Sequence, residues 1–156
     1  MRLDLKFRRL HPEAILPTKA HDGDLGWDLY ALHNVNIPPA SNILVPTGIA
    51  CQFPDGVGAI LKDRSSISSN KRVYVKAGII DNAFRGEIKV LLENPNHTSH
   101  SSEYCVLGDD NGSKYFMRGE RIAQMILVPI IDCDAMEVDF LDDTIRGVNG
   151  FGSSGS

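Results

Sequence analysis

The feature that most restricts the fold of this chain is a period-two alternation of apolar residues in short segments. Apolar side chains recur at every second position around residues 3–7, 88–92 and 136–140. Such alternation is typical of strands with one buried face. No longer stretch carries the 3.6-residue stripe of an amphipathic helix. The core-facing residues expected in these three strands are Leu3, Leu5, Phe7, Ile88, Val90, Leu92, Met136, Val138 and Phe140.

Further short apolar runs predict additional strands near residues 43–45, 48–53, 57–61, 73–75 and 125–131. Turn-forming residues such as Pro38-Pro39 and Pro54-Asp55-Gly56 separate them. One helical turn is expected over Ser65–Asn70, because Ser is a good N-cap and no strand pattern covers this stretch. We therefore expect an all-β sandwich or jelly roll with at most one short helix.

Length and charge limit the kind of protein this is. The 156 residues fit a single domain. A net charge of −4 argues against a nucleic-acid-binding protein but leaves room for a small anionic ligand held by a few cations. The longest apolar run, Met125–Ile131, is too short to span a membrane, and the N-terminus lacks the apolar stretch of a signal peptide. No membrane or nucleic-acid partner is expected.

The three cysteines, Cys51, Cys105 and Cys133, are far apart and form no Cys-x-x-Cys pair. This spacing favours reduced, buried thiols over disulfides or a zinc site. We therefore expect a cytoplasmic protein, or one in the nucleus or a host cell if its source is eukaryotic or viral.

Five polar segments are candidates for chemistry, and the first two carry opposite charges. In the segment of residues 22–31, Asp28 lies between apolar neighbours, although an acid in a strand commonly just faces water. In the segment of residues 62–68, Arg64 precedes two serines at a possible helix start. Backbone N–H groups and hydroxyls at such a start favour an anion, and an ordinary capped turn is the alternative.

The third segment, residues 78–87, places Asp81 after small and apolar residues, where an acid can serve as a general base. A plain hairpin turn is the alternative. In the fourth, residues 119–124, Gln124 is suited to contact a phosphate or to pair with buried backbone. The fifth, residues 146–155, combines Arg146 and Phe151 with glycines and serines, which suits nucleotide binding but also fits a flexible linker.

Taken in this order, the five segments resemble the five motifs of the trimeric deoxyuridine triphosphatase (dUTPase) family over roughly residues 18–155, with the third and fifth the most specific. The resemblance implies a jelly-roll-like, distorted β-barrel domain at residues 1–145 and a flexible arm at 146–156 that closes over a neighbouring subunit's site. It also implies a homotrimer that hydrolyses dUTP to dUMP and pyrophosphate with Mg²⁺. That reaction would remove dUTP from the DNA precursor pool and supply dUMP for dTMP synthesis.

The resemblance also assigns roles to residues. Asp81 would activate water for attack on the α-phosphorus, Asp28 would hold water ligands of Mg²⁺, and Phe84 would exclude a 2′-hydroxyl. The remaining positions are assigned to substrate binding: Arg64, Ser65, Ser66 and Gln124 on the phosphates; the backbone of Gly78, Ile79 and Ile80 on uracil, with Val75 and Lys89 lining the same pocket; and Arg146, Phe151, Gly152, Ser153 and Ser154 in the closing arm.

Three features depart from the family pattern. Asp63 stands where Pro is usual, which puts an acid beside the phosphate-binding residues. Phe84 stands where Tyr is usual, which keeps the ring but loses a hydroxyl. The polar segment of residues 96–114 is longer than typical and is the place where a protein partner would be sought.

Two alternatives remain open from the sequence. A dCTP deaminase of the same fold would need a Glu on the strand after the third motif, where this chain has Leu91, with Glu93 two positions on. A regulatory dUTPase-like protein that binds a partner is the second alternative. The intact Asp81 and the complete fifth segment favour retained catalysis.

Overall fold

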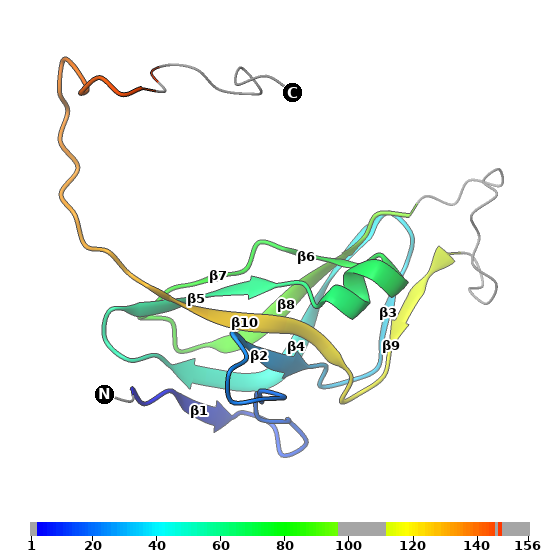
Figure 1. Cartoon of the computed structure of the whole chain (residues 1–156). Coiled ribbons are helices and arrows are strands. Elements are labelled where there is room, and N and C mark those ends of the chain that lie inside the picture. The colour runs from blue at the N-terminus through cyan, green and yellow to red at the C-terminus, as the bar shows by residue number, and fades with distance from the viewer. Residues whose placement is uncertain (1–2, 97–111, 146, 148–156) are drawn as a thin grey trace.

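The computed structural model describes residues 3–96, 112–145 and 147 of the chain. Short strands make up most of its body, as the alternation and the frequent turn residues predict (Figure 1). In chain order the elements are β1 (Lys6–Arg9), β2 (Gly26–Tyr30), β3 (Val35–Ile37), β4 (Ser41–Gln52), β5 (Val57–Lys62), the short helix Ile67–Lys71, β6 (Tyr74–Lys76), β7 (Ile79–Ile80), β8 (Glu87–Asn94), β9 (Lys114–Phe116) and β10 (Arg121–Pro129).

The strands form two four-stranded sheets and one two-stranded sheet. The first sheet has the order β1-β4-β8-β6, and the second has the order β2-β10-β5-β7. Strands β3 and β9 pair with each other in the third. Every strand pair is antiparallel. This arrangement confirms the all-β, jelly-roll-like fold expected from the sequence.

The core lies between the two larger sheets and is built from their inward-facing residues. On β8 the alternation is strict, because Ile88, Val90 and Leu92 are fully buried while the residues between them are not. Leu29 of β2 and Met125 of β10 enter the same cluster from the other sheet. The period-two pattern of residues 88–92 therefore describes a real strand with one buried face.

The pattern at the start of the chain is confirmed only in part. The strand begins at Lys6, and Leu5 and Phe7 are half-buried against the core. Leu3 is exposed and precedes the strand. The helical turn expected over Ser65–Asn70 is present as the short helix Ile67–Lys71, whose first turn reaches back to Ser65.

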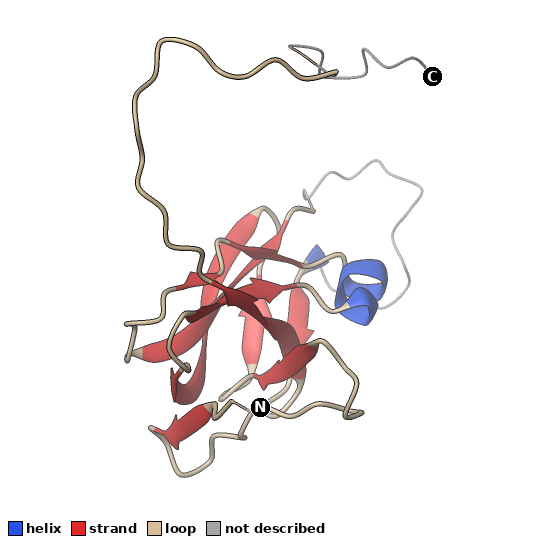
Figure 2. Cartoon of the chain, turned by 60° about the vertical axis from the view of Figure 1, so that its left-hand side comes forward, coloured by secondary structure: helices blue, strands red, loops and turns tan. Residues whose placement is uncertain are grey.

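The prediction of a strand at Met136–Phe140 is wrong for the single chain. Residues 131–145 lie outside any strand, and Met136, Val138 and Phe140 are all exposed, Phe140 at 89%. The chain leaves the body after β10 and runs away from it in both views (Figures 1 and 2). The alternation requires one covered face, and no part of this chain that the structure describes covers it.

The cysteine expectation holds for one residue and fails for another. Cys51 is buried in β4, and burial raises the pKa of its thiol to about 11. Cys133 is exposed on the segment that leaves the body, so it is not a buried thiol. Cys105 lies outside the described residues. In the described part of the chain, no helix has the length and apolar character needed to cross a membrane.

Candidate active site

Strand register brings three of the candidate polar segments together on the second sheet. Gln124 of β10 is paired with Asp28 of β2 on one side and with Lys62 of β5 on the other. Asp28 is further fixed by its backbone N–H, which donates to the Thr18 carbonyl at 2.7 Å. Three side chains from separate segments of the sequence therefore share one row of the sheet.

Asp28 is buried and lies between two guanidinium groups. Arg64 places its Nε 2.8 Å from one carboxylate oxygen of Asp28, and Arg121 places its Nε 3.4 Å from the other. Asp28 is 7% exposed, so two cations compensate a carboxylate that would be costly to bury alone. Asp28 is therefore not an ordinary strand residue that faces water.

Arg64 leads into the short helix, and the helix is anchored at both ends. The Arg64 carbonyl accepts hydrogen bonds from the N–H groups of Ile67 and Ser68 at 2.9 and 3.0 Å. Ile67 is buried, and at the far end Lys71 donates to Glu120 at 2.7 Å. Because both ends are held, the position of Arg64 is set by the fold.

Ser65 and Ser66 are exposed beside Arg64 at the start of this helix. The Ser66 side chain makes no capping hydrogen bond, so its hydroxyl is not committed to the helix. A guanidinium flanked by exposed hydroxyls matches the chemistry of a phosphate. This arrangement supports the phosphate-binding reading of residues 64–66 over that of a plain capped turn.

The third segment forms the edge strand β7 and the turn after it. Gly78 has φ +111° and its carbonyl accepts a hydrogen bond from the Leu61 N–H at 2.7 Å. A side chain here would lie 2.9 Å from the Leu61 carbonyl oxygen, so only glycine fits. Ile79 follows with its side chain 79% exposed. Strand β7 therefore presents the edge of the sheet and an apolar side chain to the outside.

Asp81 is exposed directly after β7, in a turn held from two sides. Its carbonyl accepts a hydrogen bond from the Phe84 N–H at 3.1 Å. The neighbouring Asn82 side chain donates to the carbonyls of Pro54 and Val57, both at 2.7 Å. The turn is thus fixed while the Asp81 carboxylate stays open to a ligand.

The two halves of the candidate site lie far apart in one chain. Asp28 is on β2 at one edge of the second sheet, and Asp81 follows β7 at the other edge. Three strand spacings separate these edges, which amounts to about 14 Å. The structure brings together Asp28, Arg64 and Gln124, and it does not bring Asp81 or Phe84 to them.

The side chains of Val75 and Lys89 lie in different environments, one against the core and one at the surface. Val75 is half-buried and packs against the core, while Lys89 is exposed and lies 3.5 Å from Glu87. In the sheet register Val75 is opposite the buried Leu92, whereas Lys89 belongs to the outward set of β8. The single chain therefore does not place these two side chains in one pocket.

The geometry of β8 bears on the deaminase alternative. Leu91 and Glu93 face the same side of β8, because the register with β6 has no shift between them. Glu93 forms an ion pair with Lys76 at 2.7 Å. Glu93, the acid two positions after Leu91, is therefore paired with Lys76, which disfavours the deaminase alternative.

Most residues of the predicted closing arm lie outside the part of the chain that the structure describes. Arg146, Phe151, Gly152, Ser153 and Ser154 lie outside the described residues, as do residues 97–111 of the long polar segment. Among the described residues no group of three or more His, Cys, Asp or Glu side chains is placed to hold a metal ion.

The fold and the site define an all-β protein in which a buried carboxylate lies between two guanidinium groups and a second, exposed carboxylate follows the edge strand β7. The dUTPase family model matches residues 12–101 and 111–155. The deoxyuridine 5'-triphosphate nucleotidohydrolase of Gloeothece citriformis is 39% identical over 155 residues, which is 98% of this chain and 97% of that protein. The protein of the same name from Corynebacterium diphtheriae is 39% identical over 150 residues, 95% of this chain and 90% of its own.

Solved structures agree with this match. A variant of the dUTPase of Staphylococcus bacteriophage 80alpha with bound dUpNHpp has a TM-score of 0.87 at 26% identity, over 98% of this chain and 99% of that one. The chain therefore belongs to the dUTPase family.

Sequence reasoning missed Arg121 as a member of the site. Its only signal was its position three residues before Gln124. A shift of register between Arg121 and Ala123 alters the regular alternation of β10 at this point. The strict alternation of a regular strand therefore does not predict on which face of the sheet the Arg121 side chain lies.

Proposed function

We propose that this protein hydrolyses dUTP to dUMP and pyrophosphate by attack of water on the α-phosphorus. The observation that carries the proposal is the cluster of Asp28, Arg64 and Gln124, assembled from three separate segments in a chain of the dUTPase family. Hydrolysis of this kind removes dUTP from the nucleotide pool and yields dUMP.

The phosphates would bind at Arg64 and the hydroxyls of Ser65 and Ser66. The Nε of Arg64 is bound to Asp28, which leaves its two terminal nitrogens to face an incoming phosphate. Phosphoryl transfer depends mainly on charge neutralisation and alignment. Gln124, one strand away from Asp28, would add a neutral donor to the same phosphates.

Mg²⁺ would be held by the triphosphate, with Asp28 as the protein group nearest to its water ligands. A single carboxylate at the site is compatible with this role, because Mg²⁺ usually keeps several waters and takes only one or two carboxylates from the protein. When bound, the ion would neutralise charge on the phosphates during the reaction. Asp28 would orient those waters and also hold Arg64 in place.

The β7 turn would bind the base and the sugar. The exposed backbone around Gly78–Ile80 would offer a hydrogen-bond donor and an acceptor to uracil. Cytosine would be rejected, because its donor and acceptor at N3 and C4 are the reverse of those of uracil. Phe84 would lie under the deoxyribose and leave no space for a 2′-hydroxyl. Asp81 would accept the proton of the attacking water.

A complete site requires more than one copy of the chain. Asp81 lies about 14 Å across the sheet from Asp28, which is too far for both to act on one α-phosphorus within a single chain. We infer a homotrimer in which the β7 turn of one copy faces the Asp28 cluster of another. Arg146, Phe151, Gly152, Ser153 and Ser154 would be contributed in the same way by the arm of residues 146–156.

The exposed segment of residues 130–145 would make part of this assembly. It contains six acidic residues and no cation, with Met136, Val138 and Phe140 between them. Strand β1 is an edge strand with the opposite charge, since it carries Lys6, Arg8 and Arg9. If the acidic segment added as a strand beside β1 of a neighbouring copy, the apolar face of Met136, Val138 and Phe140 would be covered. The backbone N–H and C=O groups at the outer edge of β1 would then be paired as well.

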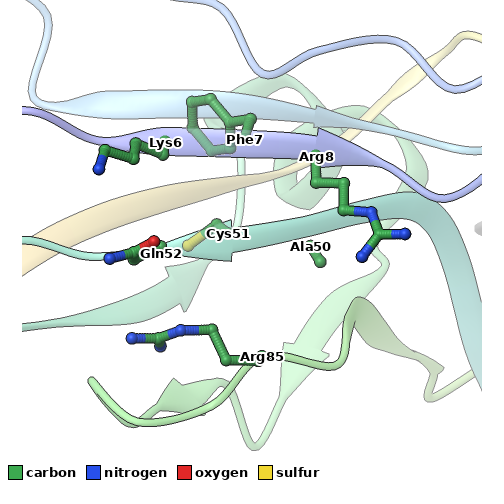
Figure 3. A pocket seen from close by; sticks show the side chains of 7 residues that line it. All are labelled: Lys6, Phe7, Arg8, Ala50, Cys51, Gln52 and Arg85. Atoms are coloured by element: carbon green, nitrogen blue, oxygen red, sulfur yellow. The ribbon is translucent and has the colours of Figure 1, made fainter.

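A pocket beside β1 fits this charge match. It has a volume of about 200 Å³ and is lined by Lys6, Phe7, Arg8, Ala50, Cys51, Gln52 and Arg85 (Figure 3). Three of these are cations, and none is an acid. The side chain of Arg85 extends beneath Cys51 and Gln52 in this view. An acidic strand laid along β1 would place carboxylates next to this pocket.

Product analysis with a panel of nucleoside triphosphates and Mg²⁺ tests the proposed activity. Consumption of dUTP to dUMP and pyrophosphate, with far slower turnover of dTTP, dCTP and UTP, is expected. Release of ammonia from dCTP would instead support the deaminase alternative. Light scattering tests the assembly separately, since three 17.1-kDa chains give about 51 kDa and a monomer would contradict the shared site.

A further inference from the structure

Asp63 makes contacts with two parts of the fold that its position in the sequence does not suggest. Its carboxylate oxygen accepts a hydrogen bond from the backbone N–H of Val75 in β6 at 2.5 Å. Its own backbone carbonyl lies 3.4 Å from the side-chain nitrogen of Gln124 in β10. Asp63 therefore connects the end of β5 to strands in both large sheets.

The bond to Val75 closes a loop around the phosphate-binding residues. Residues 64–66 and the short helix lie entirely between Asp63 and Val75. Arg64 is the residue directly after Asp63, so a displacement of Asp63 moves the guanidinium that Asp28 holds. A proline at position 63 has no side-chain acceptor and cannot make this bond.

The orientation of the carboxylate decides how its charge acts. An acid beside a phosphate site would be expected to weaken phosphate binding by repulsion. Here one carboxylate oxygen is committed to a backbone amide, and hydrogen bonds of this charge-assisted kind are the stronger ones. Asp63 is also half-buried, so its side chain is held in this orientation.

The β7 turn does not depend on Asp63 in the same way. The Gly78 carbonyl is bound by the Leu61 N–H, and Asn82 ties the turn to Pro54 and Val57. These bonds are independent of the Val75 amide. Loss of the Asp63 carboxylate should therefore disturb the phosphate-binding loop and leave the base-reading turn in place.

We propose that Asp63 is a positioning residue for phosphate binding, which fixes the backbone of residues 64–66 through the Val75 amide and orients Gln124 through its own carbonyl. The proposal rests on the proposed function, because it takes Arg64 as a phosphate ligand. What position 63 must supply is a side-chain oxygen that accepts the hydrogen bond of the Val75 N–H, and not a negative charge. An Asn side chain has such an oxygen, and an Ala side chain does not.

The test compares Asp63→Ala and Asp63→Asn in the intact assembly, with Asp55→Ala as a matched control. Asp55 is an exposed residue of the turn between β4 and β5, and its side chain takes no part in the Asp63 contacts. For Asp63→Ala we expect the KM for dUTP and the inhibition constant of inorganic tripolyphosphate to rise about tenfold, the scale of a lost hydrogen bond. The inhibition constant of deoxyuridine should stay unchanged, and kcat should change little.

Asp63→Asn and Asp55→Ala should both remain close to wild type in these constants. Amide hydrogen exchange at Val75 gives a direct readout, with faster exchange in Asp63→Ala and retained protection in Asp63→Asn. Equal behaviour of the Ala and Asn variants, or equal weakening of tripolyphosphate and deoxyuridine, would overturn the proposal. Failure of the wild-type protein to hydrolyse dUTP would instead overturn the proposed function, so the two failures are distinguishable.

Discussion

The Phe84 ring lies directly against the backbone of Gly86. A methyl group at Gly86 would come within 2.6 Å of the Cζ atom of that ring, so residue 86 must be glycine for the ring to take this position. Phe84 is 42% exposed, which leaves its outer face free for a ligand. The ring is therefore held from beneath and presented at the surface of the β7 turn.

This contact predicts how sugar selectivity depends on both residues. Phe84→Ala should lower the ratio of kcat/KM for dUTP over UTP by about tenfold or more, because the space for a 2′-hydroxyl opens. Gly86→Ala should act in the same direction by displacing the ring. Phe84→Tyr, which restores the ring usual in the family, is the control and should keep the ratio. Steady-state kinetics with both nucleotides measures it, and an unchanged ratio in Phe84→Ala would show that another group excludes ribose.

The separation of Asp81 from Arg64 predicts complementation between inactive variants. Asp81→Asn should lower kcat by about a hundredfold or more, the scale for loss of a general base, while dUTP binding is largely retained. Arg64→Ala should lose phosphate binding. Protein refolded from a mixture of the two variants should regain activity that neither variant has alone, because some shared sites then combine an intact Asp81 with an intact Arg64. A mixture with no regained activity would place both residues in one chain's site.

The position of Asp28 predicts a link between this residue and the metal requirement. Asp28→Asn should raise the Mg²⁺ concentration needed for half-maximal activity by about tenfold or more, the scale seen when partners of metal-bound groups are lost. A Mg²⁺ titration of dUTP hydrolysis measures this, with Asp55→Asn as the matched control. The same Mg²⁺ dependence in Asp28→Asn and wild type would limit Asp28 to holding Arg64.

Burial should protect the Cys51 thiol from chemical modification. Burial raises the pKa of Cys51 from 9.0 to about 11, so its thiol stays protonated where an exposed thiol ionises. A raised pKa in the folded state means that this thiol's contribution to stability is present below about pH 9 and is lost as the pH rises through about 11. Alkylation at pH 8, mapped by mass spectrometry, should spare Cys51 in the native protein and modify it after unfolding. Rapid modification of Cys51 in the native protein would contradict its burial.

The sequence predicted best those features that depend on local pattern. The alternation of Ile88, Val90 and Leu92 corresponds to a strand with one buried face, and the serines after Arg64 correspond to a helix start. The same alternation at Met136 and Phe140 gave a wrong prediction for the single chain, because a period of two shows that one face must be covered but not by which molecule.

Tertiary contacts explain why the sequence did not predict the contacts of Asp63 and Arg121. The acid at Asp63 suggested repulsion of phosphates, and the structure instead directs it at the Val75 amide, a partner twelve residues away. Arg121 joins Asp28 only because a register shift in β10 alters its side of the sheet. The roles of Asp81, Phe84 and the residues of the closing arm stay predictions that the kinetics above would test.

Hydrolysis of dUTP in ¹⁸O-labelled water with Mg²⁺ tests the central claim most directly. Attack of water on the α-phosphorus places the label in dUMP and leaves the pyrophosphate unlabelled, which is the expected result. Mass spectrometry of the two products distinguishes the position of attack. Label in the pyrophosphate, or release of orthophosphate and dUDP, would contradict the account.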